Sequence, residues 1–190
     1  MLDGITSYYA PEGFRTVRHI LLMFTDEEAT ELESLDTEME SAQTDADKAA
    51  VQAKIDEIHA AAIARTDVIY ERLNAGEDFE VLLSEYNEDG GMDYGDPYYV
   101  SAESNMWVEE FTAGAMALEN IGDVSAPVVT KFGVHIIKYV GDVTPGAVPF
   151  EEVETELREN LMTELLDAAY NTAISEWVNE FQPEYYFERL

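Results

Sequence analysis

Apolar positions along the chain form four short runs that predict strands. The run VRHILLMF at residues 17–24 is apolar and partly β-branched, and it is short enough for a buried strand. Three further stretches, at about 97–101, 125–130 and 133–140, predict the other strands, and a turn at residues 131–133 separates the last two. We therefore expect an α+β fold, with a four-stranded antiparallel sheet and short helices around it.

Apolar residues at helical spacing follow the first predicted strand. Thr25, with Glu28 three residues later, is a capping-box pattern, so a helix is expected to begin there. A second helical pattern runs over about 49–73 and closes at the sequence NAG of residues 74–76. The sequence thus predicts a helical hairpin or two abutting helices, the second about 25 residues long.

Three more helices are predicted along the rest of the chain. Glu77–Tyr86 is short and amphipathic with Asp78 as its cap, and Trp107–Leu118 is another short helix. Phe150–Phe181 is a long amphipathic helix that ends before Pro183. Its apolar stripe needs a partner surface, and we expect it to pack on an N-terminal region of the same chain absent from this sequence, or on another subunit.

These elements predict the organisation of the chain. We expect an N-terminal segment at 1–16 and a main domain at 17–142, into which a helical insertion is placed at about 25–60. A linker rich in proline and glycine at 143–149 leads to the C-terminal helix and tail at 150–190. The N-terminus has neither the basic start nor the apolar stretch of a secretion signal, and no apolar run is as long as a membrane span.

Composition indicates a folded and strongly acidic protein. A hydrophobic content of 46%, with 11 Tyr, 8 Phe and 2 Trp, argues against disorder. The formal net charge is −31, and such a field repels nucleic acid, anionic lipid surfaces and phosphorylated peptides. The absence of cysteine excludes disulfides, thiolate nucleophiles and Cys-ligated metals. We therefore expect no nucleic-acid partner.

Acidic residues concentrate in the helical insertion. Ten of them fall between residues 26 and 47, with no basic residue among them. This stretch is interpreted as a solvated helical surface, and the alternative is a substrate arm or spacer between domains.

Two of the three histidines lie in predicted strands. Side chains alternate along a strand, so His19 and His135 each point away from the isoleucine that follows, and the two imidazoles could meet on one face of the sheet. The alternative is that each is a core histidine bonded to its own neighbours. His59 is in a helical run without such a partner and is expected to be a surface or packing residue.

The loop at residues 87–96 is rich in Asp, Asn and Gly, which invites a calcium interpretation. An EF-hand loop requires Gly at its sixth position and Glu at its twelfth, whereas a loop starting at Asn87 has Met92 and Tyr98 there. We therefore expect no metal site, and a calcium-stabilised acidic domain is the least favoured hypothesis.

Five motifs along the chain form a recognisable series. They are HILL at 19–22, GEDF at 76–79, YNED at 86–89, EEF at 109–111 and IGDVSAPVVTKFGVHIIK at 121–138. Together they resemble the parvulin-type peptidyl-prolyl cis/trans isomerases, most closely their secreted foldase and periplasmic chaperone branch. The similarity covers about residues 17–24 and 70–142.

The resemblance implies roles for polar residues. His19 and His135 match the two histidines that lie beneath the parvulin active site and bond to each other, and Thr130 matches a threonine of the same network. Asp89 falls at the loop position that the family fills with Cys or Asp. Phe132 stands where the family often has Ser or Tyr. The first three also have a purely structural interpretation, in which they hold the sheet together.

The resemblance also implies an apolar pocket for the proline ring. Phe111 matches the phenylalanine of this pocket, and its middle wall is either Met106 or Trp107. The first wall is expected to be Tyr98 or Tyr99, because GDPYYV replaces the Gly-rich segment with Leu that the family usually has.

The function implied is peptidyl-prolyl isomerisation of X-Pro bonds in unphosphorylated, partly unfolded client proteins, without a cofactor. Phospho-specific parvulins carry Arg and Lys after the first strand, whereas this chain has TDEE at 25–28. The alternative is a non-catalytic chaperone or peptide-docking module on the same fold. The resemblance further implies an extracytoplasmic location, at the cell surface or in the periplasm.

Overall fold

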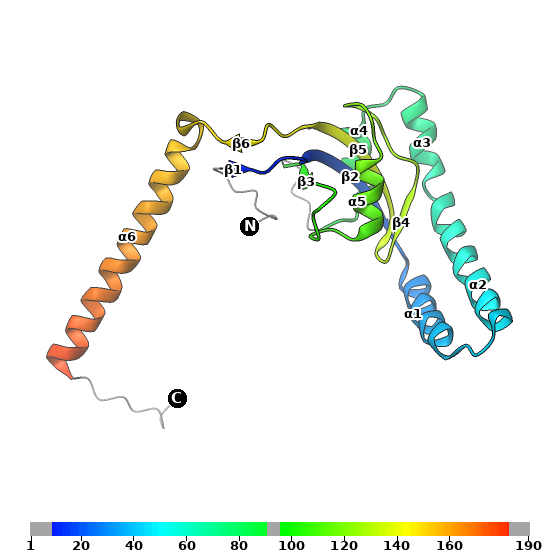
Figure 1. The fold of residues 1–190 in the computed structure, drawn as a ribbon, viewed down its shortest axis with the longest axis horizontal. Helices are drawn as coiled ribbons and strands as arrows, with labels where there is room; N and C mark the ends of the chain where they lie inside the picture. Colours follow the sequence, from blue (N-terminus) through cyan, green and yellow to red (C-terminus); the bar gives the residue numbers. More distant parts are fainter. Residues whose placement is uncertain (1–8, 91–95, 183–190) are drawn as a thin grey trace. The chain divides into compact units, whose positions relative to one another are not determined.

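A four-stranded antiparallel sheet carries the fold in the structure, which is a computed structural model of the chain (Figure 1). The strands lie in the order β3-β2-β5-β4. They are Tyr98–Val100 (β3), Arg15–Met23 (β2), Gly133–Asp142 (β5) and Val128–Thr130 (β4). The prediction of an α+β fold with a four-stranded antiparallel sheet is confirmed.

The structure describes residues 9–90 and 96–182, and the chain divides into two compact units. The first contains Ala10–Gly146 and therefore the whole sheet. The second contains the helix α6 (Phe150–Phe181).

The pairing of β2 with β5 sets the two faces of the sheet. In this register Leu21 lies opposite His135, and His19 lies opposite Ile137. Because side chains alternate along each strand, the two histidines emerge on the same face as diagonal neighbours.

Short helices cover both faces of the sheet. One face packs against α5 (Glu109–Met116). The buried cluster between them, from the strands and from residues 111–118, consists of Val17, Val100, Phe111, Ala115, Leu118, Ile137 and Tyr139. The other face packs against α3 (Asp67–Asn74) and α4 (Phe79–Tyr86). The buried cluster between the sheet and these helices consists of Ile20, Ile69, Phe79, Leu82, Leu83 and Ile136. Helix α5 is shorter than predicted because Val108, its N-cap, has an extended backbone.

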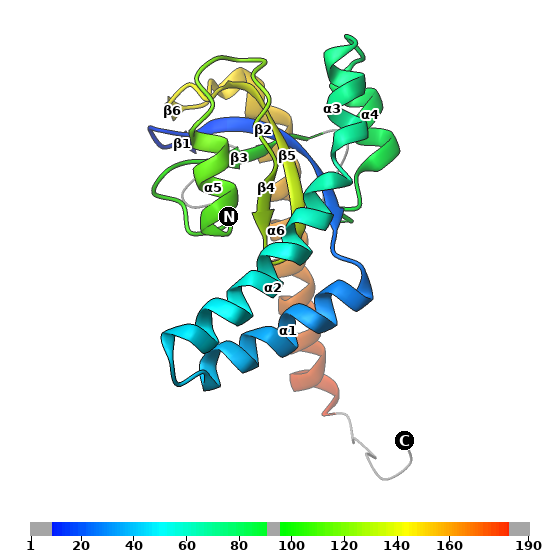
Figure 2. The ribbon, with the colours of Figure 1, turned by 90° about the vertical axis from the view of Figure 1, so that its right-hand side faces the viewer.

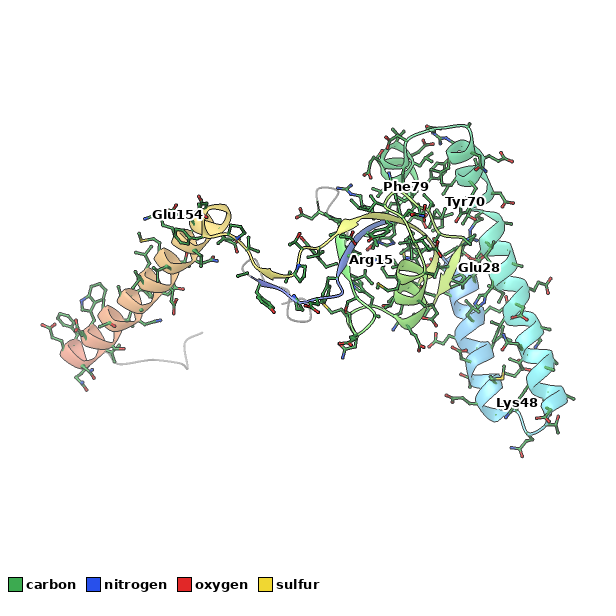
Figure 3. The ribbon with its side chains drawn as sticks, turned by 45° about the horizontal axis from the view of Figure 1, so that its top comes forward. Arg15, Glu28, Lys48, Tyr70, Phe79 and Glu154 are labelled. Carbon is green, nitrogen blue, oxygen red and sulfur yellow. The ribbon has the colours of Figure 1, made fainter. Side chains whose placement is uncertain are left out.

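Arg15, labelled in Figure 3, ties α5 to the sheet. Its guanidinium donates hydrogen bonds to the carbonyl oxygens of Ala115 at 3.2 Å and Leu118 at 2.7 Å. It also lies over the ring of Tyr139, 4.3 Å from the centroid. A cation at this end of a helix satisfies carbonyls that have no partner within the helix, so Arg15 fixes α5 above β5.

Helices α1 (Asp26–Ser41) and α2 (Asp45–Ala64) lie side by side as a hairpin inserted after β2 (Figure 2). Helix α1 begins at the predicted capping box, in which the Glu28 amide donates to the Thr25 hydroxyl and the Thr25 amide donates to the Glu28 carboxylate. Figure 3 shows Glu28 at the end of the hairpin next to the sheet and Lys48 at the far tip.

The base of the hairpin is fixed to the sheet. Phe24, Ala62 and Val134 form one buried cluster that joins the end of β2, helix α2 and strand β5. Arg65 donates to the Glu28 carboxylate at 2.7 Å and to the carbonyl of Met23 at 3.0 Å. The acidic insertion is therefore part of the first unit and has a defined position on the sheet.

The prediction of a single long helix over about 49–73 is wrong, because the helical run breaks into α2 and α3. At the break the Thr66 hydroxyl donates to the carbonyl of Ile63 at 2.7 Å, and the Thr66 amide donates to the same carbonyl at 2.8 Å. Such local bonds from a threonine hydroxyl compete with the helical ladder and tighten its last turn. The change of direction lets Ile69 enter the core.

The strand predicted over 125–130 is also shorter, since β4 begins at Val128. Pro127 has no amide hydrogen to offer the sheet. The Ser125 hydroxyl instead accepts from the amide of Ile137 at 2.9 Å, which replaces one ladder bond with a side-chain bond.

Residues in the segment expected to be a linker form β6 (Gly146–Ala147), which pairs with β1 (Tyr9–Ala10) in a separate two-stranded sheet. Helix α6 has the predicted bounds. Its large apolar side chains are mostly exposed, namely Leu161, Met162, Leu165, Leu166, Tyr170, Trp177 and Phe181. None of the described helices combines the length and the apolar character that a membrane crossing requires.

Gly133, which ends the turn between β4 and β5, lies closer to β2 than any side chain permits. Its φ is +147°, and an added Cβ would lie 2.2 Å from the carbonyl oxygen of Leu22. The central strand pair therefore depends on glycine at this position.

We expect Gly133→Ala to lower the free energy of unfolding by about 3 kcal/mol, because the new methyl group collides with backbone and the φ is strained. The matched control is Gly141→Ala on the same strand, where an added Cβ meets only the Thr16 hydroxyl at 3.5 Å. This control should change the stability by less than about 1 kcal/mol. Urea denaturation measures both, and equal effects of the two substitutions would contradict the close approach.

Candidate active site

A pocket of about 470 Å³ opens on the face of the sheet that packs against α5. Eight of the ten residues singled out from the sequence line it, namely His19, Asp89, Tyr98, Met106, Trp107, Phe111, Phe132 and His135. Thr130 lies behind the pocket, bonded to His135. Tyr99 does not line the pocket and contributes only its carbonyl oxygen, which accepts a hydrogen bond from the Trp107 indole at 2.8 Å.

The floor of the pocket is a continuous series of hydrogen-bonded side chains. His19 Nδ1 lies 3.0 Å from His135 Nδ1, and His19 Nε2 lies 3.0 Å from Asp89 Oδ2. On the other side, His135 Nε2 lies 2.9 Å from Thr130 Oγ1. The Tyr98 hydroxyl donates to Asp89 Oδ2 at 2.8 Å. We name these five residues the histidine network.

For neutral imidazoles the network has one consistent arrangement of protons. The Asp89 carboxylate can only accept, so a neutral His19 donates to it from Nε2, and His19 Nδ1 then accepts from His135 Nδ1. His135 Nε2 in turn accepts from the Thr130 hydroxyl, whose oxygen receives the amide hydrogen of Phe132 at 3.2 Å. Each neutral imidazole is thus in a tautomer set by its partners.

Burial favours these neutral imidazoles. His19 is 2% exposed and His135 is 4% exposed. Desolvation lowers the pKa of His19, although the neighbouring Asp89 carboxylate opposes the shift. Desolvation, together with the charge that His19 would carry, lowers the pKa of His135 to about 3. The two rings thus hold no positive charge at neutral pH, and Asp89 supplies the charge of the network.

The loop that carries Asp89 is bonded to β2 beyond the end of β3, on the edge of β2 that faces away from β5. The Asn87 side chain accepts from the amide of Leu21 at 2.9 Å, and the amide of Glu88 donates to the Leu21 carbonyl at 2.9 Å. The Glu88 carboxylate accepts from the amide of Met23 at 2.6 Å. These bonds place Asp89 next to His19. Burial of the Tyr98 hydroxyl, together with the neighbouring Asp89 carboxylate, raises the pKa of Tyr98, which therefore stays a donor.

Aromatic rings form the walls of the pocket. The Tyr98 ring stacks on Trp107 with 4.4 Å between centroids, and Trp107 lies 5.8 Å from Phe111. Phe111 presents its ring nearly perpendicular to both imidazoles, at 5.2 Å from each. Such edge contacts fix the orientation of the histidines, so the walls and the floor support each other.

Both candidates for the middle wall, Met106 and Trp107, line the pocket, and Met106 is the more exposed. Sequence reasoning missed six other lining residues, namely Leu21, Met23, Glu88, Gly90, Val108 and Lys131. Strand alternation could have found the first two, since they follow His19 at two-residue steps on the same face. No pattern in the sequence pointed to Lys131.

His59 lies outside the pocket, with its ring stacked on Phe24 at 5.8 Å. The loop considered for calcium falls partly on residues 91–95, outside the described residues. Within residues 9–90 and 96–182, no group of three or more acidic or histidine side chains is arranged to hold a metal ion.

The fold and the pocket define a class of domain, a parvulin-like sheet with paired histidines beneath an apolar cleft. The family described as "Rotamase: PPIC-type PPIASE domain" matches residues 19–141. The chain belongs to this family.

Relatives carry the names of foldases and chaperones. Foldase protein PrsA 4 of Bacillus cereus is 38% identical over 93 residues, which are 49% of this chain and 32% of the relative. Chaperone SurA of Pseudomonas fluorescens is 30% identical over 122 residues, which are 63% of this chain and 27% of the relative. The crystal structure of PrsA from Bacillus subtilis is 24% identical with a TM-score of 0.41, covering 89% of this chain and 48% of that one. The chain spans about a third of the length of the curated relatives it matches.

The neutral histidine pair makes the stability of the domain dependent on pH. An unfolded histidine titrates near pH 6.5, whereas the folded pKa of His135 is about 3 and that of His19 is also lowered. Between these values the unfolded chain binds more protons, so the free energy of unfolding decreases as the pH falls below 6.5. We expect His135 to contribute up to about 1.4 kcal/mol per pH unit in this range, and His19 to act in the same direction.

Urea denaturation between pH 7 and 5.5 measures this loss, and the variant His135→Gln should reduce its slope. The Cε1–H resonance of His135 in NMR spectra of the folded chain should keep its neutral position down to pH 5. A titration of this resonance near pH 6.5 would contradict the neutral network.

Proposed function

We propose that this chain catalyses the cis/trans isomerisation of X-Pro peptide bonds in unphosphorylated, partly unfolded polypeptides. The observation that carries the proposal is the histidine network beneath an aromatic pocket, in a chain that belongs to the rotamase family. The names of the relatives, foldase and chaperone, support client polypeptides as substrates.

The reaction needs a pocket and a suitable field, because no covalent bond is broken. Rotation about a peptide bond faces a barrier of about 18–20 kcal/mol, and uncatalysed X-Pro isomerisation takes tens to hundreds of seconds. Each lowering of the barrier by about 1.4 kcal/mol accelerates the reaction about tenfold. No cofactor is proposed, since twisting a bond requires neither an electron carrier nor a metal.

We assign the grip on the proline ring to Phe111, Trp107 and Met106, with Tyr98 and Phe132 completing the walls. A ring held in this apolar pocket is removed from water, which leaves the preceding carbonyl free to rotate. At the twisted transition state the C–N bond loses its partial double-bond character, so the charge on the carbonyl oxygen differs from that in the planar amide. Charges fixed around it in a site of low dielectric act on this difference.

We assign the fixed charge to Asp89, with His19, His135 and Thr130 as its positioning residues. The two neutral imidazoles link buried Thr130 to Asp89 by hydrogen bonds and so hold the carboxylate in place. They add no positive charge that would offset it. Glu88 also lines the pocket, and a phosphate group next to the substrate proline would meet like charge there. This supports unphosphorylated substrates.

The alternative of a non-catalytic chaperone or docking module rests on α6. Its exposed apolar side chains, such as Leu165, Trp177 and Phe181, would suit either client binding or packing on another part of the protein. An extracytoplasmic location is proposed from the family resemblance alone.

We expect the chain to accelerate isomerisation of X-Pro peptides in a protease-coupled assay, and Phe111→Ala to lower kcat/KM at least about tenfold, because the proline ring loses the aromatic wall beside Trp107. The matched control is Phe150→Ala, which removes the same side chain at an exposed position of α6 and should leave the activity unchanged.

Phe111 is buried, so far-UV circular dichroism and a melting curve must accompany the assay to show that the variant is folded. No acceleration by the parent chain would refute the isomerase. Full activity of a folded Phe111→Ala variant would refute the assigned pocket.

A further inference from the structure

A second hollow of about 490 Å³ lies between the α1–α2 hairpin and the turn that joins β4 to β5. Its apolar lining comes from the base of the hairpin and from β4, with Phe24, Leu32, Ile55 and Val129 contributing. Leu32 and Val129 pack against the buried cluster that fixes the hairpin to the sheet. The hollow is therefore a groove with a fixed apolar floor, and we name it the hairpin groove.

Carboxylates from two helices border the hairpin groove. Glu33 and Asp36 come from α1, and Glu110 comes from α5, on the opposite side of the turn. In the described part of the chain none of these three carboxylates forms an ion pair. Lys131 is the one lysine or arginine in the lining, so negative charge exceeds positive charge there.

An apolar floor with a carboxylate rim suits one kind of side chain. Lysine and arginine bury their aliphatic stems on apolar surface while their charged heads stay at the polar edge. An acidic or phosphorylated residue would meet like charge at the rim, and a purely apolar residue would leave the carboxylates without a partner. The chain itself has only 10 Lys+Arg against 41 Asp+Glu, so an external cation fits this site.

The hairpin groove continues from the proposed isomerase pocket. Lys131 lines both, Phe132 beside it lines the pocket, and Thr130 before it lines the groove. Thr130 also belongs to the histidine network through its bond to His135. Since an extended peptide advances about 3.3–3.6 Å per residue, a substrate held by its proline in the pocket can reach across this turn within a few residues.

We propose that the hairpin groove binds a lysine or arginine side chain of the substrate, a few residues from the isomerised proline. The inference rests on the proposed isomerase function and adds a substrate class to it, namely proline segments with a nearby basic residue. The acidic insertion then acts as a specificity element of the site.

The test uses peptides with one Ala-Pro bond among neutral residues, in which a single position is lysine, norleucine or glutamate. The position is moved from four residues before the proline to four residues after it. Norleucine keeps the aliphatic stem of lysine without its charge. Isomerisation is measured by exchange NMR at 0.15 M salt, because this method needs no protease that would itself respond to the substitution.

We expect lysine to raise kcat/KM about fivefold over glutamate at one or two adjacent positions, as one or two exposed ion pairs would. The triple variant Glu33→Gln/Asp36→Asn/Glu110→Gln should abolish this preference while the norleucine peptides are turned over as before. The control triple variant Glu27→Gln/Glu31→Gln/Glu40→Gln removes the same charge from α1 outside the groove lining, and it should keep the preference.

Turnover of the norleucine peptides without a lysine preference would overturn the hairpin groove and leave the isomerase intact. So would a preference of equal size at every position, or one that both triple variants lose equally, because either result indicates the overall negative field of the chain. If no peptide is turned over, the proposed isomerase fails and this inference fails with it.

Discussion

The contact between the two buried Nδ1 atoms of His19 and His135 is the constraint on which the site depends. Two imidazole nitrogens can approach to 3.0 Å in a dry interior only when one donates and the other accepts. This requires the diagonal register of β2 and β5, which the close approach of Gly133 to Leu22 maintains. It also requires an acceptor at one end of the series and a donor at the other, and Asp89 and Thr130 meet these needs.

The same contact connects the core of the sheet to the surface where a substrate would bind. The hydrogen-bonded series runs from buried Thr130 to Asp89 in the pocket, where the Phe111 ring lies nearly perpendicular to both imidazoles. The hydrogen bonds order this floor before any ligand enters, and preorganised charge is what an isomerase without covalent chemistry requires.

The structure shows where the acidic side chains of the insertion lie relative to the sheet. The α1–α2 hairpin carries much of the negative charge and is joined to the sheet at its base, through the cluster at Phe24 and the Arg65–Glu28 ion pair. The same hairpin forms one side of a groove that begins at Lys131, on the rim of the pocket. Charge on a rigid element close to the pocket can discriminate between substrates, whereas charge on a flexible arm would only repel at long range.

Local patterns in the sequence determined those features that depend on near neighbours. They include the strand that became Arg15–Met23, the capping box at Thr25 and the bounds of α6. Alternation showed that His19 and His135 could share a face, and the register of β2 and β5 decided that they do. The family resemblance added Asp89, Thr130 and most of the pocket walls. Only the tertiary structure decided the break at Thr66, the pairing of β1 with β6, the bond from Trp107 to Tyr99 and the groove beyond Lys131. These four features join residues distant along the chain or depend on competing side-chain bonds, and no local periodicity encodes them.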